Sequence, residues 1–270
     1  MSSRTRQTVI GLAIAVGIFA AWTALHVYGI FFIDLGTEPL WSAGLLILAQ
    51  AWLSTGLFIT AHDAMHGSLA PRLPQVQERV GQAALMIYAG LDYDRMKPAH
   101  YRHHSHVGTA DDPDFHAERP RDFAPWLLRF FTRYYTHGQL ARITVAATLY
   151  LLLGAHLLNI VVFWAVPALL ALLQLFTFGT YLPHRHSETG FADRHRARST
   201  AQPTWLSLLS CFHFGGFHHE HHLYPGEPWW RLPTRRLGGR AQDSAGTGTA
   251  GALAKARVMS ASARPNSSSE

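Results

Sequence analysis

The chain contains little cysteine and little charge. Its 270 residues include a single cysteine, Cys211, which excludes an internal disulfide framework and any cysteine-rich zinc or iron–sulfur site. Only 15% of the residues are Asp, Glu, Lys or Arg, whereas soluble domains have about 25%. A haem-attachment sequence and the Gly-x-Gly-x-x-Gly dinucleotide fingerprint are also missing. Chemistry based on thiols, attached haem or a bound dinucleotide is therefore not expected.

Charge is absent altogether from three stretches, residues 7–33, 39–62 and 143–184. A helix that crosses the hydrocarbon core of a bilayer needs about 20 mostly apolar residues. The first two stretches each fit one crossing, and the third has 42 residues, enough for two crossings with a turn near residues 159–167. We therefore predict an all-α integral membrane protein with four transmembrane helices in two hairpins.

The positions of the basic residues predict the orientation of these helices. The short loop at residues 34–38 contains no Lys or Arg, whereas ten lie between residues 67 and 142 and eleven follow residue 184. The positive-inside rule then puts both termini and the long middle segment in the cytoplasm. The net charge of +6 does not predict a nucleic-acid partner, because the basic residues are dispersed and form no known binding motif.

Histidine is abundant instead, with 18 residues that mostly lie in three groups at the edges of the apolar stretches. Positions i, i+3 and i+4 of a helix share one face, so each group can direct two or three imidazole nitrogens at one point. The predicted topology brings all three groups to the cytoplasmic face. The groups are His62 and His66; His100, His103 and His104; and His218, His221 and His222.

Eight imidazoles exceed the four ligands of a tetrahedral zinc site, so two metal ions with open coordination positions fit this set better. His184, at the end of the third apolar stretch, is a candidate ninth ligand. His186 would face another way on a helix, so at most one of the two should join the site. Of the other histidines, we expect His26 and His156 to make helix contacts.

Carboxylates accompany the histidine groups. Metal-bound imidazoles usually donate their second N–H to a carboxylate or a carbonyl group. Asp63, Asp112, Asp114 and Glu220 lie within or beside the groups and are candidates for orienting an imidazole. For Asp112, a solvated loop charge is an equally good interpretation.

The donor set also limits the metal. A site rich in imidazole and poor in carboxylate suits Fe(II), although zinc and copper also accept imidazole. A pair of iron ions can activate O2, and the position at the membrane edge indicates a substrate dissolved in lipid. Since no haem or dinucleotide motif is present, the electrons should come from a separate donor protein.

Longer strings around these residues are recognisable. The histidine groups resemble those of the membrane fatty acid desaturase/hydroxylase superfamily, and the match is closer to bacterial beta-carotene ketolases. The similar segments are HDAMHG, KPAHYRHHSHVGTADDPDFH, FGTYLPHR and HFGGFHHEHHLYP, at residues 62–67, 97–116, 178–185 and 213–225. The resemblance covers about residues 8–233. The residues after about Leu237 are a departure from the family pattern.

The resemblance implies a non-haem di-iron monooxygenase of the cell inner membrane. It would use two Fe(2+) ions, O2 and reduced ferredoxin or a similar electron donor to convert C4 of a beta-ionone ring to a ketone. Beta-carotene would give echinenone and canthaxanthin, and zeaxanthin would give astaxanthin. By the same resemblance, a cytosolic helical cap holds the iron ligands, which are His62, His66, His100, His103, His104, His184, His218, His221 and His222.

We accordingly expect a membrane di-iron oxygenase domain at residues 1–236 and a disordered tail at residues 237–270, which are rich in Gly, Ala, Ser and Thr. One alternative is a carotenoid hydroxylase or a fatty acyl desaturase or hydroxylase of the same superfamily, since these share the histidine spacing. A metal transporter is less favoured, because transport sites lie near the middle of membrane spans and the histidines here lie at one end.

Overall fold

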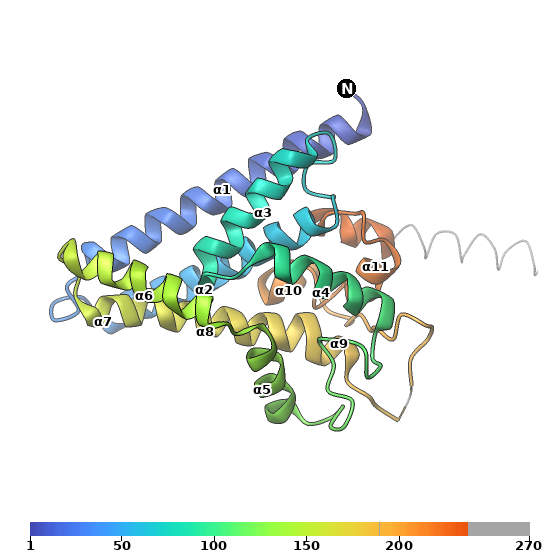
Figure 1. Ribbon diagram of the computed structural model, residues 1–270. Helices are drawn as coiled ribbons and strands as arrows, with labels where there is room; N and C mark the ends of the chain where they lie inside the picture. The colour runs from blue at the N-terminus through green and yellow to red at the C-terminus, as the bar shows by residue number, and fades with distance from the viewer. Residues whose placement is uncertain (189, 237–270) are drawn as a thin grey trace, which may run out of the picture. The chain divides into compact units, whose positions relative to one another are not determined.

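The computed structural model describes residues 1–188 and 190–236, and the regular elements within them are all helical (Figure 1). The chain forms two compact units, Met1–Leu232 and Pro233–Glu270. The first unit contains every helix described below. The predicted disordered tail at residues 237–270 lies outside the described residues.

Two long apolar helices form the first hairpin. Helix α1 spans Ser3–Phe31 and begins where the Ser2 side chain accepts a hydrogen bond from the Thr5 N–H, and α2 spans Leu40–Met65. They run antiparallel, because Gln7 near the start of α1 donates to the Ser68 carbonyl just beyond α2, at 2.7 Å. Midway along the hairpin, the Trp22 indole donates to the Ser54 hydroxyl at 2.9 Å. The predicted first hairpin is therefore present.

The third apolar stretch also forms two helical segments, but the turn between them lies earlier than residues 159–167. Helix α6 spans His137–Leu152, and a continuous helix then runs through α7 (Leu157–Ile160), η1 (Val161–Ala165), α8 (Val166–Gln174), η2 (Leu175–Tyr181) and α9 (Leu182–His184). Gly154 makes the turn at a φ of +92°, a value that L-residues with a side chain seldom adopt. Pro167 does not end the helix, because it follows the π-helical turn η1, which redistributes the backbone hydrogen bonds around it.

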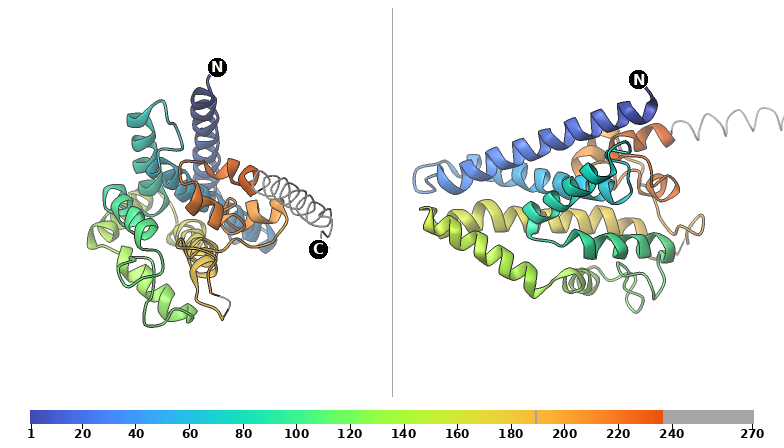
Figure 2. Two further views of the ribbon diagram at one scale, coloured as in Figure 1. Left: turned by 90° about the vertical axis from the view of Figure 1, so that its right-hand side faces the viewer. Right: turned by 45° about the horizontal axis from the view of Figure 1, so that its top comes forward.

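Shorter helices surround the end of the hairpins where α2 and α9 terminate (Figure 2). Helix α3 spans Pro74–Ala89 and packs along α2, and α4 spans Tyr93–His106. The close packing needs Gly81, because a Cβ there would lie 2.5 Å from the Tyr93 ring. The remaining elements are α5 (Phe123–Tyr134), α10 (Thr204–Cys211), α11 (His218–Leu223) and η3 (Trp229–Arg231).

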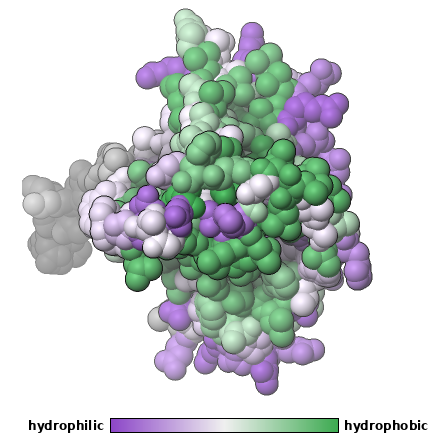
Figure 3. Space-filling view, turned by 90° about the vertical axis from the view of Figure 1, so that its left-hand side faces the viewer, coloured by the Kyte–Doolittle hydropathy of each residue, from purple (hydrophilic) through white to green (hydrophobic). Residues whose placement is uncertain are grey.

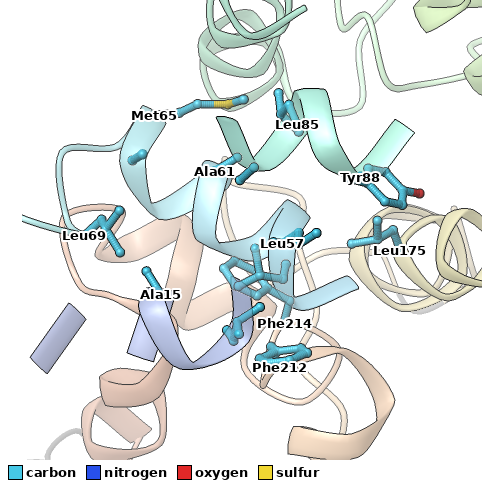
Figure 4. Packing of buried hydrophobic residues seen from close by; sticks show 14 of the residues in the cluster. Ala15, Leu57, Ala61, Met65, Leu69, Leu85, Tyr88, Leu175, Phe212 and Phe214 are labelled. Carbon is cyan, nitrogen blue, oxygen red and sulfur yellow. The ribbon is translucent and has the colours of Figure 1, made fainter. Parts of the chain in front are cut away.

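The main hydrophobic core joins these helices just below the histidine end. Side chains from α1, α2, α3, η2 and the segment after α10 meet there, including Leu57, Leu85 and Phe212 (Figure 4). Leu57 and Leu85 are fully buried. Because α2 contributes both this core and two of the histidines, packing of the core fixes the position of the site.

Much of the remaining surface is apolar. Three helical spans, Ser3–Phe31, Leu40–Met65 and Leu157–His184, are long and hydrophobic enough to cross a bilayer, whereas α6 has only 16 residues. The end of the molecule opposite the histidines is largely hydrophobic as well (Figure 3). These apolar helices identify a membrane protein, with three candidate spans among the described residues.

A buried amide ties the two hairpins together at this opposite end. The Asn159 side chain donates to the carbonyls of Gly29 and Ile33, at 3.1 and 2.8 Å, and so satisfies acceptors at the end of α1. An acceptor left unpaired in an apolar environment is costly, since no water can replace its partner.

We therefore expect Asn159→Leu to destabilise the protein by about 1–3 kcal/mol, the usual cost of an unpaired buried acceptor. Thermal unfolding of the variant in detergent, monitored by size-exclusion chromatography of samples heated to increasing temperatures, would show a lower melting temperature than for the native chain. Leu158→Ala, at a side chain that is 59% exposed, is the matched control. Equal melting temperatures for all three proteins would contradict the assigned role.

Candidate metal centre

All nine histidines predicted as ligands lie together at one end of the helices. They form a first group of five, with ring nitrogens within 4.8 Å of one another, and a second group of four that meets the same limit. The first group is His62, His66, His100, His104 and His221, and the second is His103, His184, His218 and His222. The arrangement matches the two-metal site predicted from the sequence, while the ligand role of each residue stays a prediction.

Helical spacing explains how the groups are assembled. His100 and His104 are one turn apart on α4 and share the first group, whereas His103 faces the second. On α11, His218 and His222 are one turn apart and share the second group, whereas His221 faces the first. His184 completes the second group as the last residue of α9. Both α4 and α11 therefore contribute to both groups, which holds the groups side by side.

The imidazoles meet through their Nε2 atoms. These nitrogens are 2.7 Å apart in His66 and His100 and 3.0 Å apart in His104 and His221. In the second group, the Nε2 atoms of His184 and His218 are 2.8 Å apart. A neutral imidazole has one nitrogen without a proton, so converging Nε2 lone pairs provide a donor set that suits a cation.

Burial keeps these rings neutral. It lowers the pKa of His100, His221 and His222 well below the usual value, because a charged ring would lose its hydration and lie against other imidazoles. The Nδ1 atoms of His218, His221 and His222 are also buried and have no hydrogen-bond partner in the part of the chain that the structure describes. The neutral form that metals require is therefore favoured, and the donor set fits two transition-metal ions.

Two of the nine rings are oriented by a hydrogen bond from Nδ1. His103 lies 3.0 Å from an oxygen of Asp112, which also accepts the N–H groups of Gly108 and Asp114. His184 donates its Nδ1–H to the Arg196 carbonyl at 2.9 Å. Asp112 is almost completely buried, with 1% of its surface exposed, so its interpretation as a solvated loop charge is wrong.

The charge on Asp112 makes His103 differ from the other rings. Burial disfavours a charged His103, but the adjacent carboxylate outweighs this effect and raises the pKa of the ring. The same pairing lowers the pKa of Asp112. A carboxylate held ionised against the Nδ1–H fixes the tautomer of His103 and leaves its Nε2 free for a metal.

Asp63 and Asp114 lie close to the site but have other hydrogen-bond partners. An Asp63 oxygen is 3.9 Å from Nδ1 of His62, and the carboxylate accepts the Trp229 N–H at 3.2 Å. Asp114 is likewise 3.9 Å from Nδ1 of His103 and accepts a hydrogen bond from the Tyr134 hydroxyl. Burial raises the pKa of Asp114 to about 6.

The other histidines stay outside the two groups. His186 packs its ring against Phe115 and does not join His184. His26 contacts Tyr150 at 3.0 Å, as expected for a helix contact, whereas His156 is exposed in the turn before α7 and makes no such contact. His195 is half-buried, with its ring centroid 6.5 Å from that of His222.

An apolar cavity of about 400 Å³ extends from the first histidine group toward the outside of the helices. Its walls come from α2, α3, α5, α6 and α8, and its inner end contains His62, His100 and Asp114. A second cavity of about 70 Å³ shares these three residues and continues to the second group. The sequence did not predict the larger cavity or the presence of Tyr134 in its wall, because the residues that line it come from helices far apart in the chain.

Comparisons with known proteins agree with this architecture. A family model described as fatty acid desaturase matches residues 39–145 and 133–243. The chain therefore belongs to the fatty acid desaturase family, whose match includes all nine histidines. It is an oxidoreductase by this membership.

The two relatives from Paracoccus are similar over nearly their whole length. A beta-carotene ketolase of Paracoccus sp. (strain N81106 / MBIC 01143) is 46% identical over 232 residues, which are 86% of this chain and 94% of the relative. A beta-carotene ketolase of Paracoccus sp. (strain PC1) is 45% identical, over 88% of this chain and 97% of the relative. A zeaxanthin 4-ketolase of Chlamydomonas reinhardtii is 38% identical, over 86% of this chain and 54% of the relative.

The Asp112–His103 contact generates a prediction about metal binding. Asp112→Asn keeps the shape of the side chain but removes the charge that faces the His103 N–H, and losing such an orienting partner costs about 10–100-fold in metal affinity. We expect lower metal occupancy after purification, measured by mass spectrometry of the metals. Asp111→Asn, at the exposed neighbouring carboxylate, should retain native occupancy. Equal occupancy in both variants would exclude this role for Asp112.

Proposed function

We propose that the protein is a carotenoid 4-ketolase, which converts the C4 methylene of a beta-ionone ring to a ketone. The apolar cavity that ends at the first histidine group carries this proposal, because it can deliver a lipid-soluble hydrocarbon ring to a metal centre. The names of relatives that are 36–46% identical over at least 85% of this chain support the same substrate class.

The nine histidines would hold two Fe(2+) ions, five imidazoles around one and four around the other. When bound, the ions would supply the reduction and activation of O2, with electrons from reduced ferredoxin or a similar separate donor protein. The all-imidazole donor set, the neutral state of rings such as His100, His221 and His222, and the convergence of the nine side chains support iron at this site.

The overall reaction consists of two hydroxylations at one carbon. Each replaces a C–H bond by C–OH, consumes one O2, two electrons and two protons, and releases one water. The resulting geminal diol loses a further water to leave the C4 ketone. Beta-carotene would thus give echinenone after one ring and canthaxanthin after both, and zeaxanthin would give astaxanthin.

Residues of the chain position the reactants for this chemistry. Phe58, Phe130 and Leu175 line both cavities and form an apolar passage that excludes water from the ring and from the metal centre. Asp112 and the Arg196 carbonyl hold His103 and His184 in one orientation. Restricting water at the reacting carbon prevents loss of the oxidising species to side reactions.

We further propose that α6 is the fourth crossing, so that residues 1–236 form one membrane oxygenase domain of the cell inner membrane. Hydrogen bonding supports this arrangement, because Gln139 near the start of α6 donates to the Ala89 carbonyl at the end of α3 and Tyr150 near its other end reaches His26 in α1. Arg72, Arg95 and Arg102 follow the histidine end of α2 in the sequence. By the positive-inside rule, the metal centre and both termini would be cytoplasmic.

A colour assay tests the proposed activity directly. Bacteria that accumulate beta-carotene should turn from yellow-orange to red when they express the chain, and chromatography should show echinenone and canthaxanthin. Unchanged carotenoids together with altered membrane fatty acids would instead identify an acyl desaturase or hydroxylase. A hydroxylated carotenoid without a ketone would identify a carotenoid hydroxylase.

Single ligand substitutions test the metal centre in the same cells. His103→Ala should reduce ketone formation to background while the protein still inserts into the membrane, as shown by immunoblotting of membrane fractions. His137→Ala removes an exposed imidazole at the start of α6 and should leave ketone formation near the native level. Full activity of His103→Ala would contradict the ligand assignment.

A further inference from the structure

One buried polar pair lies in the cavity wall and forms no hydrogen bond to the histidines of the site. Asp114 lines both the apolar cavity and the smaller cavity at the metal centre, and Tyr134 lines the first. The Tyr134 hydroxyl donates a hydrogen bond to one carboxylate oxygen of Asp114. Asp112 already accepts the hydrogen bond from His103, and Asp114 is 3.9 Å away from that ring. The pair is therefore available for another function.

Apart from the histidines at its inner end, the cavity around the pair is lined mostly by apolar side chains. Among the described residues that line the larger cavity, Asp114 is the only carboxylate. Two other polar residues there already donate to backbone carbonyls, Tyr88 to Ala168 and Gln139 to Ala89. Placing a carboxylate against an apolar ligand is unfavourable unless a donor satisfies it. The second carboxylate oxygen of Asp114 has no hydrogen bond in the described structure, where Tyr134 satisfies only the first.

The position of the pair suggests what would satisfy that oxygen. Asp114 lies at the junction of the two cavities, where the reacting end of a ring must lie to reach the histidine groups. In a 3-hydroxylated beta-ionone ring, the hydroxyl is on the carbon next to C4. A ring placed with C4 toward the metal centre therefore brings its 3-hydroxyl to the same end of the cavity as Asp114.

We propose that Asp114 and Tyr134 form a hydroxyl-recognition subsite, in which the ring 3-hydroxyl donates a hydrogen bond to the free carboxylate oxygen of Asp114. This inference rests on the proposed carotenoid function and adds a preference for the hydroxylated ring. An unsubstituted ring still enters, because Tyr134 partly satisfies the carboxylate. The 3-hydroxylated ring is favoured, because it supplies the second donor.

The two members of the pair then have opposite effects on selectivity. Tyr134→Phe removes the internal donor, so the carboxylate is more costly to cover with a hydrocarbon ring, and the preference for zeaxanthin over beta-carotene should rise about fivefold to tenfold. The double variant Asp114→Leu/Tyr134→Phe makes the subsite apolar, so the preference should shift toward beta-carotene by a similar factor. Loss of a merely structural contact would lower both activities together and leave their ratio unchanged.

The experiment is a competition in membranes that contain the full-length protein, iron and its electron supply. Equimolar zeaxanthin and beta-carotene are supplied together, and the ratio of their ketone products gives the ratio of kcat/KM. A second measurement gives the ratio of zeaxanthin to beta-carotene that the iron-depleted protein retains, and this binding measurement requires no turnover. Tyr88→Phe is the matched control, since its hydroxyl faces the Ala168 carbonyl, and it should keep the native ratio.

The outcomes separate the two proposals. Opposite shifts in the two variants establish the subsite, and Tyr134→Phe alone still decides the question if the double variant does not accumulate. Native ratios in both variants, or parallel loss of both activities, would refute the subsite while ketone formation by the native chain still supports the ketolase. Absence of any ketone from the native chain would refute the proposed function itself, and the retained-carotenoid ratio would still judge the subsite.

Discussion

The convergence of nine imidazoles at one end of the helices is the constraint on which the rest of the structure depends. Nε2 atoms such as those of His66 and His100 approach to 2.7 Å, and burial keeps rings such as His221 uncharged. Two ring nitrogens this close must have either a shared proton or a cation between them, because two bare lone pairs would repel one another. The apolar core beneath, with Leu57 and Leu85 fully buried, must therefore hold α2 and α3 rigidly enough to keep the rings in place.

Polarity divides the molecule along its helices. The histidine end contains the buried imidazoles and carboxylates of the site, and the long helices expose apolar side chains such as Leu45, Leu48 and Leu169. A hydrocarbon substrate partitions into the same layer as these side chains and can reach the metal centre through the cavity without crossing water. The cavity thus connects the hydrocarbon layer, in which the substrate dissolves, to the metal centre, where O2 and electrons would arrive from the aqueous side.

The sequence predicted what depends on local spacing. Helical periodicity placed His100 and His104 on one face, and the structure puts them in one group. The sequence could not predict that His103 of α4 joins the second group or that His221 of α11 joins the first. These positions depend on how the two helices pack against each other. The turn before α7 was misplaced, since Pro167 is accommodated by a π-helical turn and Gly154 supplies the bend instead. The cavity and Tyr134 are products of tertiary packing, which no local pattern encodes.

The loop after α4 shows how closely metal binding and substrate selection are connected. Asp112 faces His103, while Asp114, two residues later, faces the cavity, and the N–H of Asp114 itself donates to Asp112. A backbone change that moves one carboxylate must therefore move the other. Tyr134 comes from α5, 20 residues further along the chain; its hydroxyl donates a hydrogen bond to Asp114, and its ring packs against Phe130 and not against the histidines of the site. Selectivity for the ring can therefore change through α5 with least disturbance of the histidines, whereas changes in the loop affect both.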